Sequence, residues 1–157
     1  MKEKFDTSYP AETDLYHTTV NWRYEMKKII SAKSAGNILL IIFSALIVFH
    51  ILVLTGLVPA DIVWGGRVNT LQSTWRVFEM ISLVFTILFA IIVAVKVGYI
   101  KITRFDSAVT MFLWLMFAFL LLNSLGNLAS ESLQEKLIFT PITIIASLLV
   151  LRLVVEK

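Results

Sequence analysis

Residues 37–58 read NILLIIFSALIVFHILVLTGLV and contain no Asp, Glu, Lys or Arg. A helix needs about 20 apolar residues to cross the hydrocarbon core of a bilayer, so this run is long enough to span a membrane. Three more apolar runs follow at residues 77–95, 107–129 and 137–151, and the only charged side chain in them is Glu79. Strands of a membrane β-barrel would alternate in polarity, which none of these runs does. The sequence predicts an all-α polytopic membrane protein, a bundle of four transmembrane helices.

The composition agrees with this fold class and excludes several kinds of function. Of the 157 residues, 58% are hydrophobic and 16% are charged, whereas soluble domains carry about 25% charged residues. There is no cysteine, and the only histidines are His17 and His50, so the sequence contains no spacing typical of a metal site. It also contains no glycine-rich phosphate loop. We therefore expect no cofactor and no nucleic-acid partner, and we expect binding rather than catalysis.

The distribution of Lys and Arg predicts how the chain is oriented. Residues 1–35 are polar and interleaved with aromatic side chains, and we expect them to be cytoplasmic, with a short helix lying at the membrane interface. Residues 36–157 form the predicted transmembrane domain. If the N-terminus is inside, nine Lys and Arg near the span ends lie on the cytoplasmic side and only three, Arg67, Arg76 and Lys136, lie outside. Because Lys and Arg concentrate in cytoplasmic loops, both termini are predicted to be cytoplasmic.

With this orientation, the most polar side chains of the four spans fall in the outer leaflet. His50 lies about 20 Å along the first helix at 1.5 Å per residue, and Glu79 lies in the first turn of the second. The spacing i, i+3, i+7 places Glu79, Ser82 and Thr86 on one polar face of that second helix. Asn123 and Asn127 lie near the outer end of the third helix, and Thr140 lies at the start of the fourth. Polar groups are costly against lipid, so these side chains are expected to face one another inside the bundle.

The connection between the first two spans, residues 59–76, is longer than most loops, and long loops are often functional. It contains the apolar sequence Ile62-Val63-Trp64, which is unusual for a solvated loop. We expect it to cover the outer mouth of the bundle. Arg67 or Arg76 is the expected partner of Glu79, since an unpaired carboxylate near lipid would be costly.

Together these patterns predict a polar cavity, open to the outside, that binds a small amphipathic or lipid-like molecule. Glu79 is the predicted charged anchor, and Trp64 and Arg67 form the predicted lid. The predicted ligand-binding residues are Glu79, His50, Asn123, Asn127, Trp64, Arg67 and Thr140.

Three alternatives remain open from the sequence. In the first, the chain is an accessory or structural subunit that docks a partner membrane protein or forms a homodimer, and its polar groups only hold the helices together. In the second, it is a proton-coupled transporter, in which Glu79 and His50 exchange a proton. In the third, it is an intramembrane enzyme, in which the same two residues act as acid and base. Membrane lipids are expected partners in every case.

Three sequence segments carry a resemblance to a known family. These are residues 50–67, which end in Ile62-Val63-Trp64-Gly65-Gly66-Arg67, residues 123–127 (NSLGN), and Phe139-Thr140-Pro141. The chain resembles, over residues 36–155, a family of small four-span bacterial membrane proteins, which implies a location in the plasma (inner) membrane. Its layout also resembles the EXPERA group, whose members bind amphipathic amines or sterols inside the membrane. The sequence around Glu79 departs from that group, and the first span lacks its buried aspartate.

Overall fold

The computed structural model describes residues 24–25, 27–64, 74–101 and 106–156. Four long α-helices make up most of this part of the chain: α2 (Ala32–Leu54), α4 (Thr74–Lys96), α5 (Asp106–Ala129) and α6 (Thr140–Val154). A short 3-10 helix, η1 (Ala60–Ile62), follows α2, and a π-helical turn, η3 (Glu135–Phe139), leads into α6. Together η3 and α6 form the fourth of four helical segments that are long and apolar enough to cross a membrane. The predicted four-helix membrane bundle is confirmed.

Local sequence explains where α2 begins and ends. The helix begins at Ala32, ahead of the predicted residue 37, because the hydroxyl of Ser31 accepts a hydrogen bond from the backbone N–H of Ser34 at 3.0 Å. A serine in this position satisfies a backbone donor that the first turn leaves free. Beyond Leu54 the chain turns at Gly56, whose φ of +78° is a left-handed conformation that favours glycine and ends helices.

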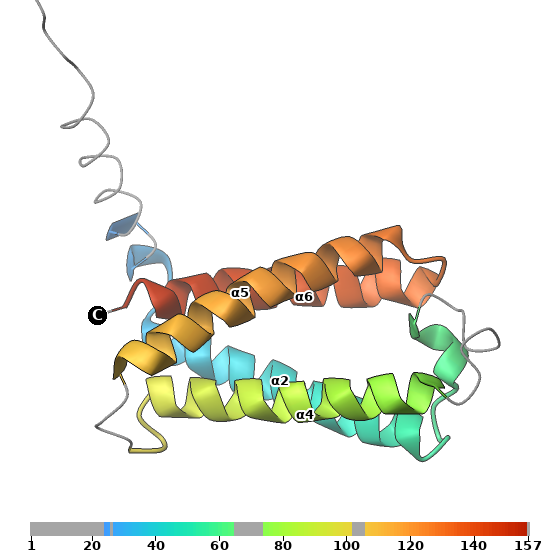
Figure 1. The fold of residues 1–157 in the computed structure, drawn as a ribbon. Coiled ribbons are helices and arrows are strands. Elements are labelled where there is room, and N and C mark those ends of the chain that lie inside the picture. The colour runs from blue at the N-terminus through green and yellow to red at the C-terminus, as the bar shows by residue number, and fades with distance from the viewer. Residues whose placement is uncertain (1–23, 26, 65–73, 102–105, 157) are drawn as a thin grey trace, which may run out of the picture.

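The four helices run up and down and pack as two pairs (Figure 1). α2 lies along α4, and α5 lies along α6; α2 also packs on α6, whereas α4 and α5 contact each other much less. We call the end of the bundle where α2 and α5 finish the polar end. The opposite end, where α2 begins and α6 finishes, is the terminal end.

The apolar core fills the half of the bundle toward the terminal end. Helix α2 and the end of α4 approach so closely there that any side chain at Gly36 would overlap Val97. The core contains almost only aliphatic and aromatic side chains, so in the described bundle it separates the polar end from the terminal end. Its buried members are Ala35, Leu39, Phe43, Phe89, Ile92, Val93, Leu113, Met116, Leu120, Ala146, Val150 and Leu153.

A network of charged groups closes the terminal end. Arg152, which is only 4% exposed, donates from Nε to the carbonyl of Ile30 at 2.7 Å and from Nη1 to Glu156 Oε2 at 2.9 Å. Lys96 donates to the backbone carbonyl of Glu156 at 2.8 Å. The hydrogen bond from Arg152, together with its charge and that of Lys27, lowers the pKa of the Glu156 carboxyl. These contacts join the segment before α2 to the ends of α4 and α6.

Two predicted features lie wholly or partly outside the described residues. The predicted interfacial helix falls mostly within residues 1–23, and only a short helical stretch before α2 is described. Of the loop at residues 59–76, the structure describes the part up to Trp64 and the part from Thr74 onward. The first part lies at the polar end (Figure 1), where the Ser132 hydroxyl donates to the carbonyl of Ile62 at 2.9 Å.

Candidate functional site

Glu79 forms the centre of a hydrogen-bonded cluster at the polar end. This residue lies in the first half of α4 and is 1% exposed. His50 Nδ1, from α2, lies 2.6 Å from Glu79 Oε1, and Trp64 Nε1, from the loop, donates to Glu79 Oε2 at 2.9 Å. A buried carboxylate needs such partners, because burial without hydrogen bonds is costly. Both carboxylate oxygens of Glu79 are therefore occupied, by residues from two other segments.

Trp64 reaches Glu79 from an unusual backbone conformation. Its φ is +58°, the only positive value at a non-glycine residue in the described chain. A left-handed conformation costs a residue with a side chain about 1–2 kcal/mol, and such outliers cluster at functional sites. The indole also packs against the ring of Phe78, with centroids 5.3 Å apart. These two contacts hold the loop against α4.

A cavity of about 580 Å³ opens next to this cluster and extends between the two helix pairs. Pockets for small molecules typically measure about 300–1,000 Å³, so this cavity has the size of a ligand site. His50 and Glu79 line its polar end together with Trp64, whereas Phe43 and Leu120 line it toward the apolar core. One end of the cavity is thus polar and the other apolar.

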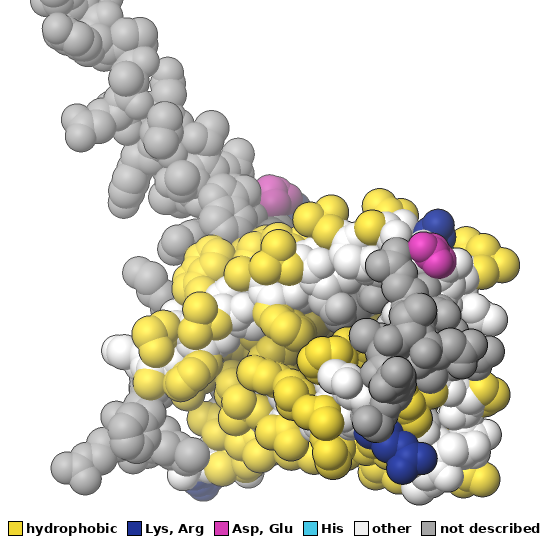
Figure 2. All heavy atoms as spheres, turned by 45° about the vertical axis from the view of Figure 1, so that its right-hand side comes forward, with side chains coloured by type: hydrophobic (Ala, Val, Ile, Leu, Met, Phe, Trp, Pro, Cys, Tyr) yellow, Lys and Arg dark blue, Asp and Glu magenta, His cyan; other side chains and the backbone are white. Residues whose placement is uncertain are grey.

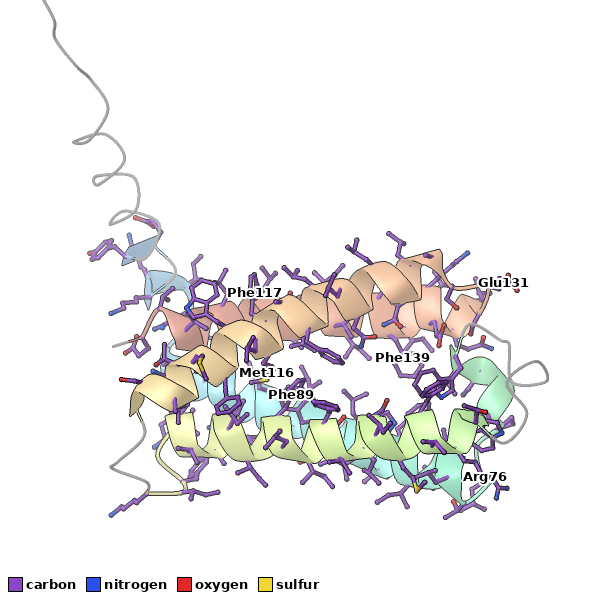
Figure 3. All side chains as sticks on the ribbon, viewed as in Figure 1. Arg76, Phe89, Met116, Phe117, Glu131 and Phe139 are labelled. Carbon is purple, nitrogen blue, oxygen red and sulfur yellow. The ribbon has the colours of Figure 1, made fainter. Side chains whose placement is uncertain are left out.

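Six phenylalanine rings contribute to the cavity wall. Phe89 and Phe119 meet edge to face across the gap between α4 and α5, with centroids 5.5 Å apart, and Phe89 and Phe139 project into the space between the helix pairs (Figure 3). The ring of Phe49, from α2, packs on the ring of Phe139, with centroids 5.0 Å apart. The phenylalanine residues that line the cavity are Phe43, Phe49, Phe85, Phe89, Phe119 and Phe139.

The structure brings most of the predicted site residues together. His50, Trp64 and Glu79 are hydrogen-bonded, and Asn123 and Asn127 line the same cavity from α5. Asn123 is exposed at the cavity rim, and Asn127 is half-buried. The polar stripe predicted on α4 also lines the cavity, since Ser82 and Thr86 are among its wall residues together with Glu79.

Thr140, Arg67 and Arg76 differ from this pattern. Thr140 is buried and donates to the carbonyl of Glu135 at 3.1 Å, so it supports the π-helical turn and is not a wall residue of the cavity. Arg67 lies outside the described residues. Arg76 does not pair with Glu79 in the described structure: its guanidinium lies over the ring of Trp75, 5.4 Å from the centroid. The partners of Glu79 are therefore the imidazole of His50 and the indole of Trp64, and not an arginine.

Two polar features of the site were not predicted from the sequence. Glu135, which is 9% exposed, lines the cavity from the π-helical turn. Its position just before the fourth apolar run is also typical of an interfacial charge, so no sequence pattern distinguishes it as a cavity residue. The second feature is the Ser124 hydroxyl on α5, which donates to Thr143 Oγ1 on α6 at 2.8 Å and joins the two helices at the cavity wall, to which Thr143 belongs.

The chemistry available at this site is that of a carboxylate-supported imidazole. When Nδ1–H of His50 is donated to Glu79, Nε2 is the nitrogen left to accept a hydrogen bond or a proton. Among the described residues, no group of three His, Cys, Asp or Glu side chains is placed to hold a metal ion.

Comparison with known proteins found no matching family model, no matching curated protein and no matching solved structure. The family resemblance of the sequence therefore stays a prediction.

Proposed function

We propose that this protein binds a small amphipathic or lipid-like molecule in the cavity at the polar end of its bundle. One observation carries the proposal: a cavity of about 580 Å³ has a hydrogen-bonded acid and imidazole at one end, six phenylalanine rings in its wall, and an apolar end at the core. Such an arrangement complements a molecule with one polar and one apolar end. In this proposal Glu79 and His50 fix the polar group, and the rings receive the apolar part.

The proposed orientation places this cavity toward the outer face of the plasma membrane. It rests on the excess of Lys and Arg around the terminal end, which is the cytoplasmic end under the positive-inside rule. The apolar core then closes the cavity on the cytoplasmic side. A blind cavity suits a binding protein better than a transporter, because a transported proton or solute needs a second polar half-channel.

Native mass spectrometry of protein released gently from membranes tests this proposal. We expect wild-type protein to carry a bound small molecule, and we expect Glu79→Gln, which removes the charge at the polar end, to lose at least nine-tenths of it. Glu131→Gln is the matched control, because it is the same substitution at an exposed residue outside the cavity wall.

Protein without any bound small molecule would overturn the proposal. Protein carrying only another polypeptide would also overturn it and would favour the alternative of an accessory subunit. Equal occupancy in wild type and Glu79→Gln would show that Glu79 does not anchor the molecule.

A further inference from the structure

The cavity wall is incomplete on one side of the bundle. All exposed residues among its described wall residues belong to α4 or α5: Phe85, Phe119, Asn123, Gly126 and Ala129. A residue that both lines a cavity and is exposed lies at its rim. Since α4 and α5 also contact each other less than any other two neighbouring helices of the bundle, the cavity opens sideways between these two helices. Phe85 and Phe119 stack across this gap, with ring centroids 5.9 Å apart and ring planes at 14° to each other, and close its edge toward the terminal end.

This lateral opening faces the hydrocarbon of the bilayer. Phe85 lies about 16 Å from the start of α4 at 1.5 Å per residue, near the middle of a helix that spans the membrane. The outer surfaces of α4 and α5 beside the gap carry large hydrophobic side chains such as Val84 and Leu122, which are 64% and 68% exposed. Figure 2 shows hydrophobic side chains over much of this side of the molecule. A molecule that enters here comes from the lipid phase.

The polar end of the cavity selects the head group. The described wall contains two carboxyl side chains, Glu79 and Glu135, and the imidazole of His50, and it contains no Lys or Arg to balance the charge of an anion. Its other polar side chains are uncharged amides and hydroxyls, which both donate and accept hydrogen bonds: Ser82, Thr86, Asn123, Asn127, Ser130 and Thr143. Carboxylates accept hydrogen bonds and repel anions. His50 Nε2 accepts as well when Nδ1–H is donated to Glu79. An uncharged or cationic head group that donates hydrogen bonds fits this end, and an anionic head group does not.

We infer that the ligand is a bilayer-dissolved amphiphile with an apolar chain and a hydrogen-bond-donating head group that is not anionic, and that it enters sideways between α4 and α5. Long-chain alcohols and long-chain amines belong to this class. The inference rests on the proposed function and adds to it the entry route and the chemistry of the head group. The head group contacts His50 and Glu79, and the chain lies among the phenylalanine rings.

Photolabelling from the bilayer tests the entry route and the head group together. Wild-type protein in phosphatidylcholine vesicles is exposed to three diazirine probes that share one alkyl chain and end in an alcohol, an ammonium or a sulfate. Labelled peptides are then identified by mass spectrometry. The alcohol and ammonium probes are expected to label the interior residues Phe43 and Leu120, which are 1% and 4% exposed and beyond the reach of boundary lipid. The sulfate probe is expected to label these residues at least fivefold less.

A variant at the rim tests the route on its own. A Cβ atom at Gly126 would meet no atom within 4 Å, so a side chain has open space to start from, and Gly126→Phe is expected to fold and to narrow the opening. It should reduce interior labelling at least fivefold. Leu125→Phe is the matched control, because Leu125 is 64% exposed and lies outside the cavity wall; it should leave interior labelling unchanged.

The outcomes separate this inference from the proposed function. Equal interior labelling by the sulfate probe would overturn the head-group assignment, and unchanged labelling in Gly126→Phe would overturn the lateral route. If no probe labels the interior while wild-type protein still carries a small molecule in native mass spectrometry, the inference fails and the proposed function stands. If that bound molecule is also missing, both fail.

Discussion

At the scale of single residues, the site depends on one buried carboxylate that is shared by two rings. Glu79 accepts from Trp64 and is bonded to His50, so a helix, a loop and a second helix meet at one side chain. The sequence placed all three residues near one another but assigned an arginine as the partner of Glu79. Trp64 reaches the carboxylate through a left-handed backbone conformation, and propensity does not predict that conformation for a tryptophan.

Removal of the indole donor should destabilise the protein. Trp64→Phe keeps an aromatic ring but leaves one oxygen of the buried Glu79 without its hydrogen bond, and an unsatisfied buried group costs about 1–3 kcal/mol, more if charged. We expect a lower midpoint of thermal unfolding in detergent. Trp114→Phe is the control, since Trp114 is 47% exposed on the outer surface of α5 and should change the midpoint little. Equal midpoints for wild type and Trp64→Phe would contradict the role of this bond.

At the scale of helices, sequence patterns predicted the elements better than their pairing. The apolar runs predicted all four membrane helices, and the spacing of Glu79, Ser82 and Thr86 predicted the face of α4 that lines the cavity. Phe89 lies on the same face of α4, three residues after Thr86, so this spacing could also have identified one aromatic residue of the cavity wall. The burial of Glu135 could not be predicted from the sequence, because it depends on a π-helical turn at the start of the fourth span. Which helices pack closely depends on tertiary contacts such as that of Gly36 with Val97.

Two glycine substitutions should have opposite effects on stability. Gly36→Val forces a side chain into Val97, and overpacking of this kind costs about 1–3 kcal/mol. Gly126→Ala meets no neighbour within 4 Å, and replacement of an interior helical glycine by alanine stabilises by about 0.5–1 kcal/mol. Unfolding in a mixed-detergent titration measures both changes. A stable Gly36→Val variant would contradict the close approach of α2 to the end of α4.

At the scale of the whole molecule, the bundle has two unlike halves. The half toward the terminal end is packed with apolar side chains, and the half toward the polar end holds the cavity with its acid and imidazole. The most polar side chains of the spans, among them Glu79, His50 and Asn127, line the half that holds the cavity. Four helices can keep a blind cavity inside a membrane because the apolar half supplies the packing that the cavity removes.

The proposed orientation predicts which end is accessible from outside the cell. The chain has no cysteine, so single-cysteine variants give an unambiguous signal. A membrane-impermeant maleimide should label Glu131→Cys, at the exposed polar end, in intact cells. It should label Glu25→Cys, next to the terminal end, only after the membrane is permeabilised. The reverse pattern would place the cavity on the cytoplasmic side.

The central claim is that the Glu79 cluster holds a ligand and does more than join helices. Thermal unfolding of delipidated protein, with and without a lipid extract of the producing cells, tests it most directly, because a ligand that binds only the folded state stabilises by about 2.7 kcal/mol at a hundred times its Kd. We predict that the extract raises the midpoint of wild type and of Glu131→Gln, and that Glu79→Gln gains no such increase. The same increase in all three proteins, or none in wild type, would contradict the claim.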